Sequence, residues 1–156
     1  MLYVIPASGP VLLNMMKSYG TLLADALNTK NKEEETLALD LIGLILHIFY
    51  SLNCVELPAF FEDSMAEWMT YFKYILEIKS DSEPLRKSKT RVIKDVSLYC
   101  EKYSPEFKDY VPTFFNLIWV QVELTTMESE YDKVKGGYVS IIDCGKYPEV
   151  HAYSRV

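Results

Sequence analysis

The sequence predicts an all-α fold built from repeated pairs of helices, and three observations lead to this prediction. Apolar residues recur at spacings of three and four along most of the 156 residues. Two stretches 54 positions apart, LPAFF at 57–61 and VPTFF at 111–115, open in the same way. Prolines at 10, 58 and 112 each precede a pair of adjacent apolar residues. The repeated opening therefore favours three copies of a structural unit over two copies of a binding site.

The first helical pair is predicted over residues 10–53. Its first helix spans 10–27, and Pro10 suits a first turn, where a missing N–H costs nothing. A polar turn follows, and three glutamates, 33–35, place negative charge where the dipole of the next helix favours it. That second helix, 33–53, is apolar nearly all round, which is typical of a helix buried among others.

The second pair is predicted over residues 58–103. One helix is expected from Pro58 to about residue 78 and another over 84–103, joined by a short polar connection. The apolar stripe expected to be buried on the first of these helices comprises Phe61, Met65, Trp68, Met69, Phe72, Ile75 and Leu76.

The third pair is predicted over residues 105–143. Its first helix, 106–126, contains Pro112, which either bends the helix or marks a second start at Val111. Residues 133–143 contain two adjacent glycines before Tyr-Val-Ser-Ile-Ile, a pattern that resembles a turn and a strand. A helix is favoured there because no partner strand occurs elsewhere, and residues 144–156 are a tail or the start of a further repeat.

Together the three pairs predict a right-handed α-α superhelix, with residues 1–156 forming a single segment of a HEAT-repeat solenoid. The spacings of 48 and 54 between the prolines are somewhat longer than the roughly 40–47 residues of such pairs. Cys54, Cys100 and Cys144 recur at a matching period, near the far end of the second helix of each pair.

The composition restricts the partners. A net charge of −6 disfavours nucleic acid and favours a basic protein surface. The most apolar run, 37–52, is interrupted by Asp40 and His47 and falls short of the roughly 20 residues that span a bilayer, so no membrane insertion is expected. No secretory signal is apparent, and three unpaired thiols fit a reducing compartment.

The sequence predicts neither an enzyme nor a cofactor or metal site. His47 is expected to be a buried, hydrogen-bonded core residue, and His151 lies in the predicted tail. Neither has a cysteine or serine partner at a motif spacing, and the cysteines are 46 and 44 residues apart, far from any metal-ligand or redox spacing. The six glycines form no phosphate-binding loop, so catalytic, cofactor and metal residues are all expected to be none.

Two charged groups are candidates for protein binding. Glu62, Asp63 and Glu67 form an acidic cluster in which Asp63 and Glu67 share a helix face; it is either a solvated face or a contact for a basic partner. The helix over 84–103 has a basic group that is either ordinary helix surface or a contact for an acidic partner: Arg86, Lys87, Lys89, Arg91 and Lys94. Trp68 and Trp119 lie on apolar stripes and are expected to anchor the core.

The chain contains three distinctive stretches: FYSLN at 49–53, LPAFFEDSMAEWM at 57–69, and LYCEKYSPEFKDYVPTFFNLIW at 98–119. They resemble the CAS-type exportins, the importin-α re-exporters of the importin-β superfamily, and the resemblance covers about residues 10–132. Members are solenoids of around twenty repeats, so this chain resembles a fragment of their N-terminal third. The mixed charge of 79–87 and the glycine pair at 136–137 depart from the family pattern.

The resemblance implies a non-catalytic protein-binding solenoid that exports importin-α in complex with Ran-GTP and moves between nucleus and cytoplasm. It implies that the second helices of the pairs face the partners, so Arg91, Lys94 and Glu101 are the positions to test first. A generic helical adaptor without Ran dependence is the alternative. Excision from a solenoid would expose apolar faces, so self-association is also expected.

Overall fold

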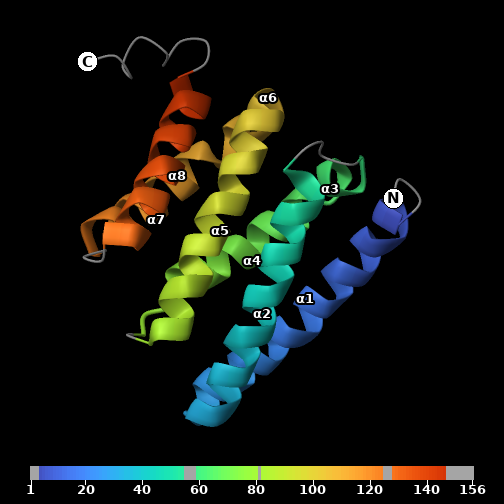
Figure 1. Ribbon diagram of the computed structural model, residues 1–156, viewed down its shortest axis with the longest axis vertical. Coiled ribbons are helices and arrows are strands. Elements are labelled where there is room, and N and C mark those ends of the chain that lie inside the picture. Colours follow the sequence, from blue (N-terminus) through green and yellow to red (C-terminus); the bar gives the residue numbers. More distant parts are fainter. Residues whose placement is uncertain (1–3, 55–58, 81, 125–127, 147–156) are drawn as a thin grey trace. The chain divides into compact units, whose positions relative to one another are not determined.

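The computed structural model describes residues 4–54, 59–80, 82–124 and 128–146, and all regular structure in these ranges is helical (Figure 1). The all-α prediction is therefore confirmed. The contacts divide the chain into two compact units, Met1–Arg91 and Val92–Val156, with the boundary inside helix α5 (Glu83–Lys102).

Unit 1 opens with an antiparallel pair of helices, α1 (Val4–Thr29) and α2 (Lys32–Asn53), which pack side by side (Figure 1). The turn between them is a Schellman motif: Lys30 adopts a left-handed φ of 56°, and the Asn31 N–H donates to the Ala26 carbonyl at 3.0 Å. The Asn31 side chain then caps α2 by accepting from the Glu34 N–H at 3.2 Å.

The predicted helix start at Pro10 is wrong, because α1 begins at Val4 and encloses Pro10. Pro6 occupies the first turn instead, where the backbone N–H would have no partner within the helix. Pro10 lies where it cannot donate to the carbonyl four residues earlier, so α1 forms with one backbone hydrogen bond missing.

The single helix predicted over 58–78 is also wrong: it consists of α3 (Ala59–Asp63) and α4 (Met65–Glu77), and Pro58 lies outside the described residues. Ser64 separates them, and its Oγ donates to the Phe60 carbonyl at 2.6 Å. A serine that bonds back to the preceding turn competes with the helical ladder and bends the chain.

The core of unit 1 is an aromatic cluster around Phe49 of α2. Its ring centroid lies 5.1 Å from that of Phe61, 4.7 Å from Trp68 and 5.5 Å from Phe72, all in edge-to-face geometry. The whole predicted stripe on α3 and α4 is buried, so Trp68 is confirmed as a core anchor. The phenylalanine pair of the repeated LPAFF opening is therefore structural, since Phe61 is fully buried and Phe60 packs against Gly9 of α1.

The first half of α5 belongs to unit 1 and runs in the same direction as α2. Ser88 Oγ donates to the Leu39 carbonyl at 3.4 Å, and one turn further along both helices the Arg91 guanidinium covers Gly43. A Cβ on Gly43 would lie 2.7 Å from Arg91 Nη1, so the absent side chain makes room for the arginine.

Unit 2 comprises the second half of α5, α6 (Ser104–Phe107), the 3-10 turn η1 (Lys108–Tyr110), α7 (Val111–Leu124) and α8 (Glu128–Lys146). Of the two alternatives for Pro112, a second start at Val111 is confirmed, because α7 begins there. The predicted end at residue 126 lies outside the described residues. Phe107 is fully buried, with its ring stacked on Tyr99 at 6.5 Å and packed on Phe114 at 6.0 Å.

The helix favoured over 133–143 is confirmed, since α8 spans these residues without interruption. Its two glycines differ in their surroundings. A Cβ on Gly136 would meet nothing within 4 Å, whereas a Cβ on Gly137 would collide with Ile93 Cγ2 of α5. Gly137 therefore allows α8 to lie directly against α5.

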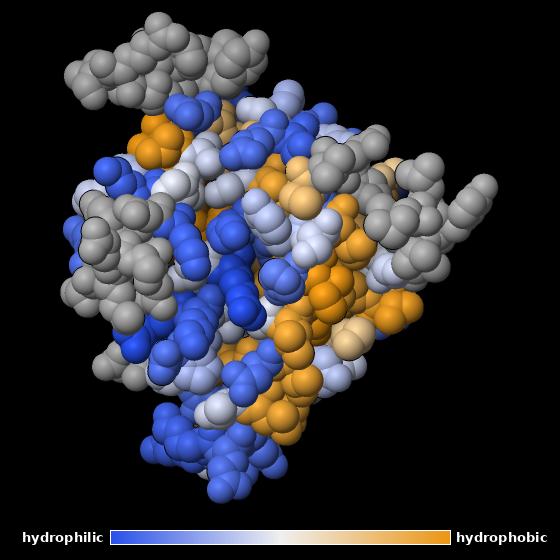
Figure 2. Space-filling model, in the orientation of Figure 1, coloured by the Kyte–Doolittle hydropathy of each residue, from blue (hydrophilic) through white to orange (hydrophobic). Residues whose placement is uncertain are grey.

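Three burial predictions are wrong. His47 is exposed on α2, and Trp119 is 42% exposed on α7, where its ring packs on Tyr138 of α8 at 5.2 Å. Helix α2 is not buried all round, because Leu37, Leu44 and Ile48 lie along one exposed face. Figure 2 shows apolar surface gathered over α1 and α2, where Val11 and Met15 are exposed as well.

Candidate functional site

The first candidate group, Arg91, Lys94 and Glu101, lies on α5 at spacings of three and seven, which places all three on one helix face. Glu101 is exposed, while Arg91 and Lys94 are half-buried. Within unit 1 the Arg91 guanidinium packs against Gly43 of α2, so this arginine also has a structural contact. Glu101 is thus the member of the group whose charge is most open to a partner.

The acidic candidates lie on two short helices. Glu62 is half-buried and Asp63 exposed on α3, whereas Glu67 lies on α4 beyond the break at Ser64. The prediction that Asp63 and Glu67 share one helix face is therefore wrong. Glu67 Oε2 instead pairs with Lys17 Nζ of α1 at 3.0 Å, and the hydrogen bond to this carboxylate raises the pKa of Lys17.

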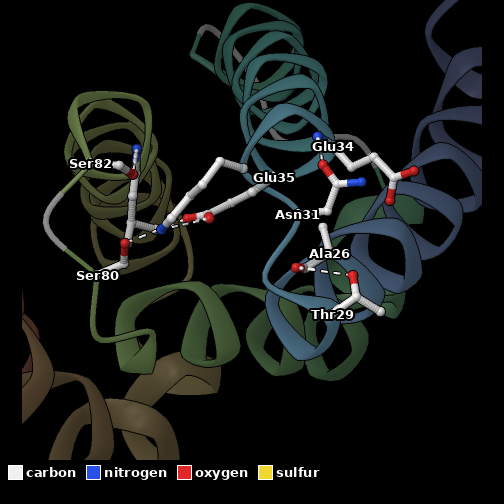
Figure 3. A network of polar contacts seen from close by, with 9 residues as sticks. Ala26, Thr29, Asn31, Glu34, Glu35, Ser80 and Ser82 are labelled. Atoms are coloured by element: carbon white, nitrogen blue, oxygen red, sulfur yellow. Dashed lines mark hydrogen bonds and ion pairs between the residues drawn. The ribbon is translucent and has the colours of Figure 1, made fainter.

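A buried carboxylate at the start of α2 was not foreseen from the sequence. In the sequence Glu35 is one of three charges at the helix start, yet it is 3% exposed. It accepts from Lys32 Nζ at 3.2 Å and from Ser80 Oγ, in the loop after α4, at 3.5 Å (Figure 3). This contact ties the α4–α5 connection of unit 1 to α2, and it is structural.

Lys89 does not belong to a surface basic group, contrary to the sequence interpretation. It is 9% exposed, and its Nζ donates to the Ile78 carbonyl at the C-terminal end of α4 at 2.6 Å. A cation there satisfies a carbonyl that the helix leaves without a partner. Burial lowers the pKa of Lys89.

The structure also brings together two cysteines that are 44 residues apart in the sequence. Cys100 near the end of α5 and Cys144 near the end of α8 are both buried in unit 2, and a hydrogen bond links their side chains. Their separation in the sequence matches no redox motif. The signal that could have found the pair was their matching place near the ends of successive second helices, which stacking makes neighbours.

Within the described parts of the chain, no group of three or more His, Cys, Asp or Glu side chains is arranged to hold a metal ion. In the same residues, α2 is long and apolar enough to cross a membrane by length and composition. One face of α2 is buried in the core of unit 1, with Leu39, Ile42, Leu46 and Phe49 at most 2% exposed, as in a core helix of a folded domain.

Paired helices around aromatic cores, with charged side chains on α3 and α5, define the class: an all-α helical-repeat protein. The chain belongs to the Cse1 family, whose sequence pattern matches residues 1–143. Among curated relatives, it is 39% identical over 100 residues to Exportin-2 of Danio rerio, an alignment covering 58% of this chain and 10% of that protein. It is 38% identical over 98 residues to Exportin-2 of Homo sapiens, with 57% and 10% covered.

The chain spans about a tenth of the length of the curated relatives that it matches. No solved structure matches it. The resemblance first noted in the sequence is confirmed at the level of the family.

Proposed function

We propose that this chain is a segment of a nuclear export receptor, a non-catalytic solenoid that binds importin-α and Ran-GTP and shuttles between nucleus and cytoplasm. The observation that supports this proposal is the Cse1 match over residues 1–143, together with relatives named Exportin-2. The function belongs to the whole receptor, of which these residues contribute part of the scaffold.

The proposed mechanism is differential binding. Cargo and Ran-GTP each stabilise a solenoid curvature that the other prefers, so each raises the affinity of the other. GTP hydrolysis on Ran removes one of the two ligands and releases the cargo. The chain supplies packing and surface charge to this cycle, and no bond is made or broken on it.

The proposed contact residues are those with charge near the surface. Glu101 is exposed on α5, with Arg91 and Lys94 half-buried on the same face, and Glu62, Asp63 and Glu67 lie on α3 and α4. The net charge of −6 favours basic partner surfaces and increases the rate of encounter with them.

The test uses the full-length parent receptor immobilised as bait, with Ran loaded with GTP or with GDP and importin-α present or absent. We expect retention of Ran only in its GTP form, and stronger retention when importin-α is added. The variant Glu101→Lys should weaken the retention of Ran-GTP. The matched control is Glu106→Lys, because Glu106 is an exposed glutamate on α6 outside the candidate groups.

The second candidate function is a helical adaptor that does not depend on Ran. It predicts equal retention of any partner with either nucleotide form of Ran. That result in the full-length receptor would overturn the export proposal, and an equal effect of the two charge reversals would remove Glu101 from the interface.

A further inference from the structure

Unit 2 contains a pair of thiols that the proposed function does not use. Cys100 and Cys144 are 5% and 3% exposed, and they lie on different helices near the same end of unit 2. Cys144 Sγ also lies 3.6 Å from the Ser104 carbonyl oxygen and 3.7 Å from Ser104 Oγ. Three elements, α5, α6 and α8, therefore meet at this sulfur.

The packing of α8 on α5 sets the approach of the two sulfurs. Gly137 lies against Ile93, and seven residues further along each helix Cys144 meets Cys100. Because the contact moves seven residues toward the C-terminus on both helices, the two helices run parallel here, and the two contacts lie about two turns apart. The missing side chain at Gly137 allows the close approach of the two helices, and this packing places Cys144 within hydrogen-bonding reach of Cys100.

The surroundings make the two thiols chemically unequal. The hydrogen bond from Cys100, opposed by burial and assisted by the bond from Ser104 Oγ, lowers the pKa of Cys144 to about 7. Burial, together with the same hydrogen bond, raises the pKa of Cys100. The lowered pKa makes Cys144 the thiol that ionises first, with Cys100 as the donor to the resulting thiolate; before ionisation Cys144 donates to the Ser104 carbonyl. This order is that of an attacking and a resolving cysteine.

We propose that Cys100 and Cys144 form an oxidation site, in which a hydroperoxide converts the two thiols into an intramolecular disulfide that links α5 to α8. The Cys144 thiolate attacks one peroxide oxygen, the O–O bond breaks, and hydroxide leaves, giving a sulfenic acid on Cys144. The Cys100 sulfur then attacks the Cys144 sulfur, and water leaves with the sulfenic oxygen and the Cys100 proton. Two electrons pass from the two thiols to one peroxide molecule.

This site concerns unit 2 alone and does not depend on the proposed function. The disulfide would close a loop from residue 100 to residue 144 and hold the two helices at their observed packing. Cys54, which is exposed and lies in unit 1, stays outside the reaction between the pair.

The experiment treats the intact chain with hydrogen peroxide, blocks remaining thiols with N-ethylmaleimide, and maps peptides by mass spectrometry without reduction. We expect a peptide that joins Cys100 to Cys144 and is lighter by two hydrogens, restored by dithiothreitol, with Cys54 still able to react with N-ethylmaleimide. The Cys54→Ser variant should behave identically. In Cys100→Ser, dimedone should trap a sulfenic acid on Cys144, and in Cys144→Ser it should trap none on Cys100.

Because the main measurement uses the unaltered chain, it does not depend on how well a variant folds. Disulfides between chains through Cys54, or oxidation of all three thiols at equal rates, would overturn the proposal. So would a failure of Cys54→Ser to form the linked peptide while its helical circular dichroism is unchanged. A midpoint near pH 7 for alkylation of Cys144 in the unaltered chain, raised in Cys100→Ala because alanine has no donor, checks the role of the hydrogen bond.

Discussion

Lys89 illustrates how one buried residue links two helices at an energetic cost. Its ammonium group leaves water to satisfy the last turn of α4 through the Ile78 carbonyl, and burial of the charge lowers the pKa of Lys89. From the sequence, Lys89 was one member of a basic group on a helix surface. Only the tertiary contact distinguishes it from Arg86 and Lys87, which are exposed on the same helix.

The lowered pKa of Lys89 predicts a pH dependence of stability. The folded-state pKa lies below the unfolded value of 10.5, so between these two values the unfolded chain binds more protons and the free energy of unfolding rises with pH. We expect the unaltered chain to gain stability relative to Lys89→Met between pH 7 and about pH 10. Urea unfolding at both pH values measures this difference, and the tyrosine titrations common to both proteins cancel.

If the free energy of unfolding of Lys89→Met changed with pH by the same amount as that of the unaltered chain, a group other than Lys89 would be responsible. Lys87→Met is the matched control, because Lys87 is exposed and pairs with Glu83 one turn away on the same helix at 3.3 Å. Its stability should follow that of the unaltered chain across the range.

At the scale of elements, the packing of α8 depends on Gly137, a residue type that by itself disfavours a helix. The pair Gly136-Gly137 weakened the helix prediction over 133–143, since each glycine costs helix stability of roughly 0.5–1 kcal/mol. In the structure α8 is uninterrupted, and only Gly137 has a packing reason, the contact with Ile93. Close helix packing compensates for the lower intrinsic propensity.

The two glycines provide a matched pair of substitutions. Gly137→Ala should destabilise the chain by about 1–3 kcal/mol, because its Cβ forces Ile93 to move in a packed core. Gly136→Ala should stabilise it by about 0.5–1 kcal/mol, because its Cβ meets open space. Chemical unfolding of both variants measures the difference, and equal effects of the two substitutions would refute the packing argument.

The element boundaries show where the pattern was informative. The apolar stripe over Phe61–Leu76 was predicted completely, because burial follows helical periodicity. The break at Ser64 was not predicted, since it depends on a side-chain hydrogen bond to Phe60 that leaves the apolar period unchanged. The predicted burial of His47 and Trp119 was wrong for a related reason. In a largely apolar helix the sequence does not show which face a neighbouring helix will cover.

At the scale of the whole molecule, large apolar side chains remain exposed. They occur on α1 and α2 as well as on α7 and α8, and the most exposed among the described residues are Val11, Leu37, Leu44, Val120 and Val139. Exposed apolar surface of this kind favours association with other protein surfaces.

We expect this 156-residue chain in isolation to self-associate with increasing concentration, which light scattering would detect as a rising mean mass. The double variant Leu44→Lys/Ile48→Lys should reduce association, because both side chains lie on the exposed face of α2 and each substitution adds a charge. Lys substitutions at the exposed polar positions Thr36 and His47 of the same helix change the net charge by the same amount and serve as the control. A constant monomer mass up to high concentration would contradict the expectation.

The sequence by itself determined the all-α class, the approximate helices, the buried stripes and the family, because periodicity and motif spacing are local properties of the chain. The tertiary structure alone decided the burial of Glu35 and Lys89, the pairing of Glu67 with Lys17 and the meeting of Cys100 with Cys144. These outcomes depend on which helix faces pack together within each unit. Local sequence patterns do not determine that packing, because the residues involved lie tens of positions apart.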